Sequence, residues 1–116
     1  MWSRMSGVQI PSVTQIKIEL MQNLLNAAQL KDAQNLLPDW EVSGEFLFRV
    51  FLFKNFVEAF DFMTTISSTA EEMNHHPDWS NVYNKVEVRL STHDSGGVTS
   101  LDVDLALSMD SLFIKE

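Results

Sequence analysis

The stretch of sequence that decides the fold is residues 71–93, EEMNHHPDWSNVYNKVEVRLSTH. It holds all three histidines of the chain, and within it a helical spacing of apolar residues gives way to the alternation of a strand. Pro77 disfavours helical backbone at His76, so we expect His75 in the last turn of a helix and His76 in extended chain. Their imidazoles can then converge on one pocket, which neighbours inside a regular helix could not easily do.

An amphipathic helix is predicted before this junction. Asn55 and Glu58 have the spacing of an N-cap and the third helical residue. Apolar residues then recur every three or four positions, and we expect this stripe to pack in the core rather than to hold a cofactor. The stripe consists of Phe56, Ala59, Phe60, Met63, Ile66 or Ser67, Ala70 and Met73.

A strand over 82–92 is the clearest strand prediction after the junction, because apolar and polar residues alternate there. The apolar face holds Val82, Val86, Val88 and Leu90, and the polar face holds Tyr83, Lys85, Glu87 and Arg89. Residues 94–97, Asp-Ser-Gly-Gly, predict a turn. A last helix is expected to follow, with Thr99 as its N-cap and Asp102 three residues later.

The N-terminal half predicts one helix and two strands. The helix is expected over 12–36, with Ser12 and Gln15 at capping-box spacing. A short strand is expected over 40–44, and a Phe- and Val-rich strand over 45–53. The second strand is almost wholly apolar on both faces, so one face should meet helices and the other a neighbouring subunit or a loop.

Composition limits the classes of protein that the chain can belong to. With 116 residues and 45% hydrophobic content it fits one domain, which we place at 11–116 after a flexible tail over 1–10. The formal charge of -8 and the lack of a basic patch argue against direct binding to nucleic acid. Cysteine is absent, which suits a reducing compartment, and the longest apolar run, 50–53, is too short to span a membrane. Residues 1–5 lack the features of a secretory signal, so we expect a cytoplasmic protein, with the nucleus as a second location.

The three histidines favour proton transfer as the chemistry of the site. Histidine changes its charge near neutral pH, and Glu71 lies one helical turn before His75, where it could orient the ring. A surface role at a helix end would be the usual interpretation of one lone histidine, but three with a carboxylate in one window favour acid/base work. Zinc binding is less favoured, because the chain has no H-E-x-x-H or H-x-H spacing. Trp79 and Tyr83 could stack on a flat ligand or simply pack beside the strand.

The same residues resemble the pterin-4a-carbinolamine dehydratase family. The family pattern is an acidic residue, three spacers, His-His-Pro, an aromatic residue, a histidine ten residues after it and a later aspartate. Here these positions are Glu71, His75-His76-Pro77, Tyr83, His93 and Asp102. The sequence around them also reads like that of family members from about residue 36 to residue 112.

The resemblance implies a fold, a reaction and an assembly. The implied fold is a single α+β domain, a four-stranded antiparallel sheet with helices on one face, assembled as a homodimer or homotetramer. The implied reaction is loss of water from a 4a-hydroxytetrahydropterin, the spent cofactor of aromatic amino acid hydroxylases, to give the quinonoid dihydropterin in tetrahydrobiopterin recycling. It needs no metal and no further cofactor. Relatives in animals also serve as dimerization cofactors of a homeodomain transcription factor, so a protein-binding role is the alternative function.

The resemblance also assigns roles to residues. The catalytic set is His75, His76 and His93, with His76 expected to accept the proton of ring N5 and the other two to assist departure of the 4a hydroxyl. Contacts to the pterin are expected from Glu71, Asn74, Pro77, Trp79, Ser91, Thr92, Asp94 and Asp102. Some relatives carry an acid at the position of Asn74 and a basic residue at the position of Leu101, so those charged contacts are not expected in this chain.

Overall fold

The structure of the protein is a computed structural model that describes residues 23–115. Its elements follow in the order α2 (Ala27–Leu36), β1 (Glu41–Val42), β2 (Leu47–Leu52), α3 (Phe56–Met73), β3 (Asp78–Val82), β4 (Lys85–Leu90), the 3-10 turn η2 (His93–Ser95) and α4 (Ser100–Lys115). The expected flexible tail over 1–10 lies outside the described residues.

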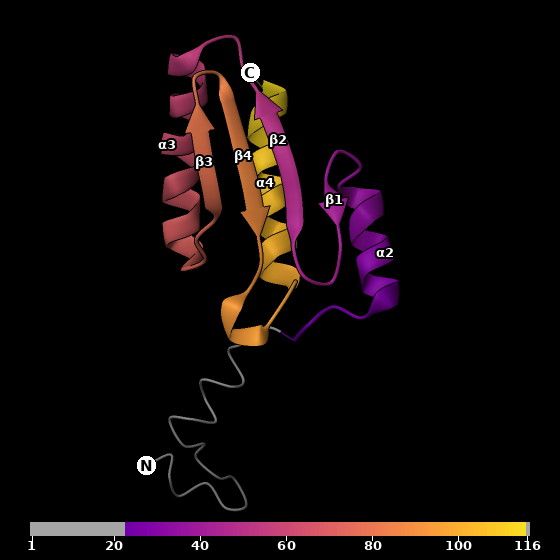
Figure 1. Ribbon diagram of the computed structural model, residues 1–116. Helices are drawn as coiled ribbons and strands as arrows, with labels where there is room; N and C mark the ends of the chain where they lie inside the picture. Colours follow the sequence, from indigo (N-terminus) through magenta and orange to yellow (C-terminus); the bar gives the residue numbers. More distant parts are fainter. Residues whose placement is uncertain (1–22, 116) are drawn as a thin grey trace, which may run out of the picture.

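The four strands form one antiparallel sheet in the order β1-β2-β4-β3. Helices α3 and α4 lie side by side behind the sheet, and α2 lies beside β1 (Figure 1). The end of α3, the end of β4 and the start of α4 all lie at the same end of the molecule (Figure 1). The expected α+β fold with a four-stranded antiparallel sheet is confirmed, and its topology gathers three chain segments where the site was expected.

Alternation along the central strands divides the sheet into a buried and an open face. Leu47 and Phe51 of β2 are opposite Leu90 and Val86 of β4, and all four side chains are buried. Phe48, Val50 and Leu52 alternate with them and point to the other face, where Val50 and Leu52 are exposed. The predicted strands at 40–44 and 45–53 are therefore present as β1 and β2, although both are shorter than expected.

Helix α3 begins where the sequence predicts, because the Asn55 side chain accepts a hydrogen bond of 2.9 Å from the Glu58 N–H. Its buried face agrees with the predicted stripe at Ala59, Ile66 and Ala70 but not at its phenylalanines. The buried residues are Ala59, Phe62, Ile66 and Ala70. Phe56 and Phe60 were expected in the core, but both are exposed and stack on each other with ring centroids 5.7 Å apart. A 3.6-residue period allows either row, and Phe62 fills the core instead by packing against Phe51.

The predicted strand over 82–92 is wrong in its first part. Tyr83 and Asn84 form the turn of a hairpin between β3 and β4, and Tyr83 has a left-handed φ of 51°. The Asn81 amide donates to the Tyr83 and Lys85 carbonyls, and the Asn84 amide donates to the Phe53 carbonyl. These two asparagines are the turn signal that the apolar alternation obscured. From Lys85 onward the predicted alternation is confirmed, with Val86, Val88 and Leu90 buried.

The first described helix is shorter than predicted. Asn23 to Asn26 are not helical, and α2 begins at Ala27. Asn26 and Gln29 form a reciprocal capping box with two hydrogen bonds of 2.8 Å, which sets this start. The capping box predicted at Ser12 and Gln15 lies outside the described residues.

The predicted turn after β4 is confirmed. It consists of η2, which ends at Gly96 with a left-handed φ of 80°, and of a bridge between Thr92 and Gly97. A β-carbon on Gly97 would collide with the Gly44 carbonyl oxygen, so the two backbones can meet only because position 97 has no side chain. This close approach fixes Thr92 and the chain leading into α4.

Candidate functional site

The first part of the candidate site is the turn that ends α3. Asn74 adopts the left-handed conformation, with φ 52° and ψ 41°, and the His75 N–H donates to the Ala70 carbonyl at 3.0 Å. A residue in the left-handed conformation commonly ends a helix, and asparagine adopts this conformation more easily than most other residues. The chain then turns so that His75 points inward and His76 stays exposed. The prediction that His75 belongs to the last helical turn is wrong, because α3 ends at Met73 and both histidines lie in the chain between α3 and β3.

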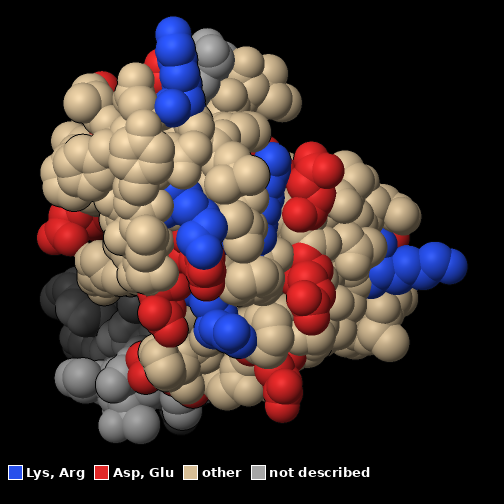
Figure 2. Space-filling view, turned by 45° about the horizontal axis from the view of Figure 1, so that its top comes forward, with Lys and Arg blue, Asp and Glu red and all other residues tan. Residues whose placement is uncertain are grey.

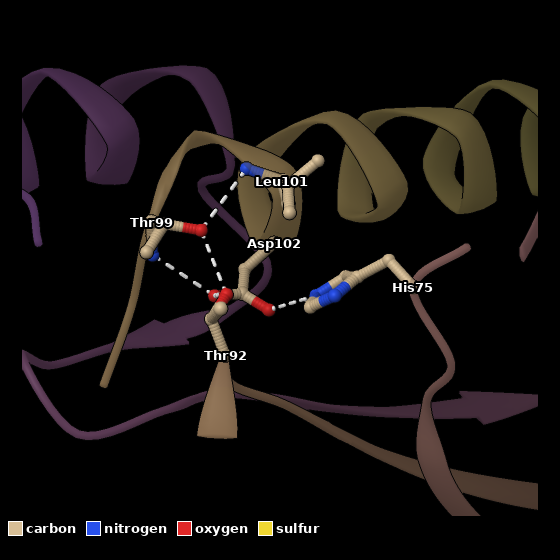
Figure 3. Close-up of polar contacts among 5 residues, drawn as sticks. All are labelled: His75, Thr92, Thr99, Leu101 and Asp102. Atoms are coloured by element: carbon tan, nitrogen blue, oxygen red, sulfur yellow. Dashed lines mark hydrogen bonds and ion pairs between the residues drawn. The ribbon is translucent and has the colours of Figure 1, made fainter. Parts of the chain in front are cut away.

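His75 forms a buried pair with Asp102 of α4. The ring Nε2 lies 2.6 Å from Asp102 Oδ1, and the Asp102 side chain is completely buried. The second carboxylate oxygen, Oδ2, accepts hydrogen bonds from the Thr92 hydroxyl at 2.8 Å and from the Thr99 N–H at 2.9 Å. Figure 3 shows the five residues of this network converging from α4, from the end of β4 and from the chain after α3. Because every donor faces an acceptor, the site holds a buried carboxylate without an unsatisfied polar group.

His76 forms a second, exposed pair with Glu71. Its Nε2 lies 2.9 Å from Glu71 Oε1, and both side chains are largely exposed. The expectation that Glu71 orients His75 is therefore wrong. The left-handed turn at Asn74 carries His75 away from the helix face on which Glu71 lies, and it brings His76 back toward that face.

The remaining predicted residues surround these two pairs in different ways. His93 is exposed at the start of η2, and among residues 23–115 no hydrogen bond or ion pair joins it to either of the other histidines. Thr92 is buried within the Asp102 network, Ser91 and Pro77 are half-buried, and Asn74 and Asp94 are exposed. Trp79 is half-buried and packs against the hydrophobic core. Tyr83 lies at the exposed hairpin turn.

Thr99 is the residue whose place in the Asp102 network the sequence analysis missed. The Thr-x-x-Asp spacing predicted Thr99 as the cap of the last helix, and the Thr99 hydroxyl indeed accepts the Leu101 N–H at 3.2 Å. The same hydroxyl also lies 2.7 Å from that of Thr92, which the sequence could not reveal. Thr92 and Thr99 meet only because the turn between them folds back on itself.

The face of the molecule shown in Figure 2 carries mixed charge. On the face shown in Figure 2, basic side chains stand among acidic ones rather than in one continuous basic area. The described residues contain no group of three or more His, Cys, Asp or Glu that could hold a metal ion. Within the same range, no helix has the length and apolar character needed to cross a membrane.

The fold and the site together define the class of protein to which the chain belongs. It is a small α+β domain with a buried His–Asp pair at one end of its sheet. Residues 23–112 match the sequence profile of the family described as pterin 4 alpha carbinolamine dehydratase. The chain belongs to this family.

Three relatives illustrate how close the similarity is. Proteins named "Putative pterin-4-alpha-carbinolamine dehydratase" are 50% identical over 92 residues in Synechococcus sp. (strain WH7803) and 51% identical over 94 residues in Bradyrhizobium diazoefficiens. Each alignment covers 79% of this chain, and they cover 99% and 94% of those proteins. A crystal structure of a "transcriptional coactivator/pterin dehydratase" from Brucella melitensis is similar with a TM-score of 0.74 and 41% identity, over 78% of this chain and 98% of that one.

Proposed function

We propose that the protein is a dehydratase that removes water from a 4a-hydroxytetrahydropterin and releases the quinonoid dihydropterin. The observation that carries this proposal is the buried His75–Asp102 pair beside the exposed His76–Glu71 pair, in a chain of this family. The physiological context that we propose is the recycling of tetrahydrobiopterin after aromatic amino acid hydroxylation. The proposed location is the cytoplasm, with the nucleus as a second location.

The proposed reaction needs two proton transfers and no change of oxidation state. One proton is delivered to the 4a hydroxyl, whose C–O bond breaks to release water. The proton on ring N5 is removed, and the electrons of its bond form the C4a=N5 double bond. Histidine suits both steps, because the unperturbed pKa of a histidine side chain lies close to neutral pH.

We assign the N5 proton to His76. Its ring is exposed, so a proton taken from the substrate can pass to solvent, and Glu71 accepts a hydrogen bond from the ring at 2.9 Å. His75 and His93 are assigned to the departing hydroxyl. In His75, Asp102 occupies Nε2, so Nδ1 is the nitrogen left for the substrate.

The other predicted contact residues fall into two groups. Asp102 is completely buried, so we propose that it acts through His75 rather than on the pterin. Contacts to the pterin are proposed from Glu71, Asn74, Pro77, Trp79, Ser91, Thr92 and Asp94, through side chain or backbone.

The proposed function can be tested with preformed 4a-hydroxytetrahydropterin. Its loss is followed by absorbance for the wild-type protein, for His76→Ala and for buffer alone. We expect the wild type to accelerate the loss and His76→Ala to lose at least about 100-fold in turnover, the usual size of one acid/base contribution. A wild-type rate equal to that of buffer would remove the dehydratase proposal, and near-normal turnover of His76→Ala would remove the role of His76.

A second candidate function is protein binding through α3. Phe56, Val57 and Phe60 are about half or more exposed and adjacent on this helix, and such apolar areas often mark contacts between proteins. We propose that this area mediates a homodimer or homotetramer, or the binding of a protein partner. The Brucella melitensis protein is named a transcriptional coactivator as well as a pterin dehydratase, which supports a partner-binding role within the family.

Sedimentation of the wild type beside Phe60→Ser tests this role. An intact assembly in Phe60→Ser would count against it. Co-purification of both forms from cells then asks whether a partner other than a second copy is bound.

A further inference from the structure

The hydrogen bonds around Asp102 form a continuous chain that begins at the first turn of α4. The Leu101 N–H donates to the Thr99 hydroxyl, the Thr99 and Thr92 hydroxyl oxygens lie 2.7 Å apart, and the Thr92 hydroxyl donates to Asp102 Oδ2. Thr92, Thr99 and Asp102 are all buried. In such surroundings a hydrogen bond is stronger than in water, and an unpaired polar group is costly.

The direction of each hydrogen bond in this chain is fixed by a count of protons. A hydroxyl has one proton, and that of Thr92 is given to Asp102. The bond between the two hydroxyls must therefore use the proton of Thr99. The Thr99 oxygen can receive the Leu101 N–H at the same time. The chain thus runs one way, from the backbone of α4 to Asp102.

The hydrogen bonds to the second oxygen of Asp102 fix the orientation of its carboxylate. Oδ2 accepts from the Thr92 hydroxyl and from the Thr99 N–H, so the carboxylate cannot turn without breaking both bonds. Oδ1 faces His75 Nε2 at 2.6 Å and can only accept. The proton of the neutral imidazole must then reside on Nε2. Nδ1 has no partner among residues 23–115, where no buried side-chain nitrogen or oxygen is unsatisfied, so Nδ1 reaches the surface.

We propose that Thr99 and Thr92 are positioning residues that hold the Asp102 carboxylate in the orientation at which it selects the Nε2–H tautomer of His75 and so presents Nδ1 as the reactive nitrogen. The value of this tautomer for catalysis rests on the proposed function, whereas the tautomer itself does not. A purely structural role for Thr99, as the cap of α4, would stabilise the helix without selecting a tautomer.

Two substitutions separate these roles. Thr92→Val removes the donor to Asp102 but leaves Thr99 able to cap α4. Thr99→Ser keeps both the cap and the hydroxyl chain. Thr64→Val is the matched control, since the Thr64 hydroxyl donates to the Phe60 carbonyl on the exposed side of α3, away from Asp102.

The measurement is a two-bond ¹H–¹⁵N correlation spectrum of the histidine rings at a pH where they are neutral. We expect His75 of the wild type, Thr99→Ser and Thr64→Val to carry its proton on Nε2. Thr92→Val should show a mixture with the Nδ1–H form and a turnover about ten-fold lower, the equivalent of one buried hydrogen bond. A wild-type ring protonated on Nδ1 would overturn the inference without the need of any variant. So would a Thr92→Val spectrum and turnover identical to those of the wild type.

The same data separate the two proposals. If the tautomer behaves as expected but no form of the protein dehydrates the pterin, the proposed function fails and the positioning role stands. If the wild type dehydrates the pterin but Thr92→Val leaves both readouts unchanged, the positioning role fails and the proposed function stands.

Discussion

Residues 23–115 contain two histidine–carboxylate pairs that differ chiefly in their exposure to water. In the first, the side chains of His75 and Asp102 are 9% and 0% exposed and their atoms are 2.6 Å apart. In the second, those of His76 and Glu71 are 59% and 80% exposed and 2.9 Å apart. An ion pair in water contributes little to stability, whereas a buried one is held in one geometry by its neighbours.

The difference shows how the same chemical groups serve two purposes. Asp102 is fixed by Thr92 and Thr99, so it can determine which nitrogen of His75 is protonated. No second partner supports the Glu71 carboxylate among the residues that the structure describes, and its contact with His76 can break and form in solvent. We therefore expect substitutions in the two pairs to have very different effects.

The largest effect is expected from Asp102→Asn. An amide can keep its oxygen toward Thr92 and Thr99 only by turning its NH₂ toward His75, which forces the ring proton onto Nδ1. Turnover should fall by about 100- to 10,000-fold, while the free energy of unfolding should fall by only about 1–3 kcal/mol. Steady-state kinetics and urea unfolding measure the two quantities, and unchanged turnover would refute the importance of the buried pair.

A large loss of stability is expected from Gly97→Ala. The added β-carbon would meet the Gly44 carbonyl oxygen, which belongs to rigid backbone, and Thr92 is bridged to Gly97. We expect the free energy of unfolding to fall by about 1–3 kcal/mol. Gly44→Ala is the control, because its β-carbon would only meet Leu30 at 3.7 Å. Equal stability of the two variants in urea would show that the close approach does not support the site.

A smaller effect is expected from Asn74→Val, which changes the turn shared by both pairs. Asn74 is left-handed, and a β-branched residue tolerates that conformation poorly, with an expected loss of about 1–2 kcal/mol. Asn74→Gly should be as stable as the wild type or slightly more stable. Thermal unfolding compares the three proteins, and a Val variant as stable as the Gly variant would contradict the assignment of strain.

The smallest effect is expected from Glu71→Gln. The pair is exposed, so its loss should change the free energy of unfolding by no more than about 0.5 kcal/mol. Urea unfolding at low and high salt measures it. A loss of more than about 2 kcal/mol would contradict the contrast between the two pairs.

Local signals in the sequence predicted much of the fold. The Asn55 cap, the turn over 94–97 and the alternation from Lys85 onward each depend on neighbours in the chain, and the structure confirms them. The hairpin at Tyr83 was missed because the apolar alternation continues across it. The start of α2 was predicted too early because the helical periodicity also extends to residues before Asn26.

The site was predicted as a group of residues but not as a set of contacts. The junction of helix and strand drew attention to His75 and His76, and the family pattern added Asp102. Which carboxylate meets which ring depends on the left-handed turn at Asn74 and on the packing of α4 against α3, and neither follows from spacing alone. The hydroxyl chain through Thr99 likewise required the folded chain.

Imidazole rescue of His75→Ala tests the central claim most directly, namely that His75 is a proton-transfer group held by Asp102. This variant leaves a space beside a buried carboxylate that free imidazole can occupy. We predict that it loses at least about 100-fold in turnover and that added imidazole restores turnover with saturation in His75→Ala but not in His75→Ala/Asp102→Asn. Near-wild-type turnover of His75→Ala without imidazole would contradict the claim.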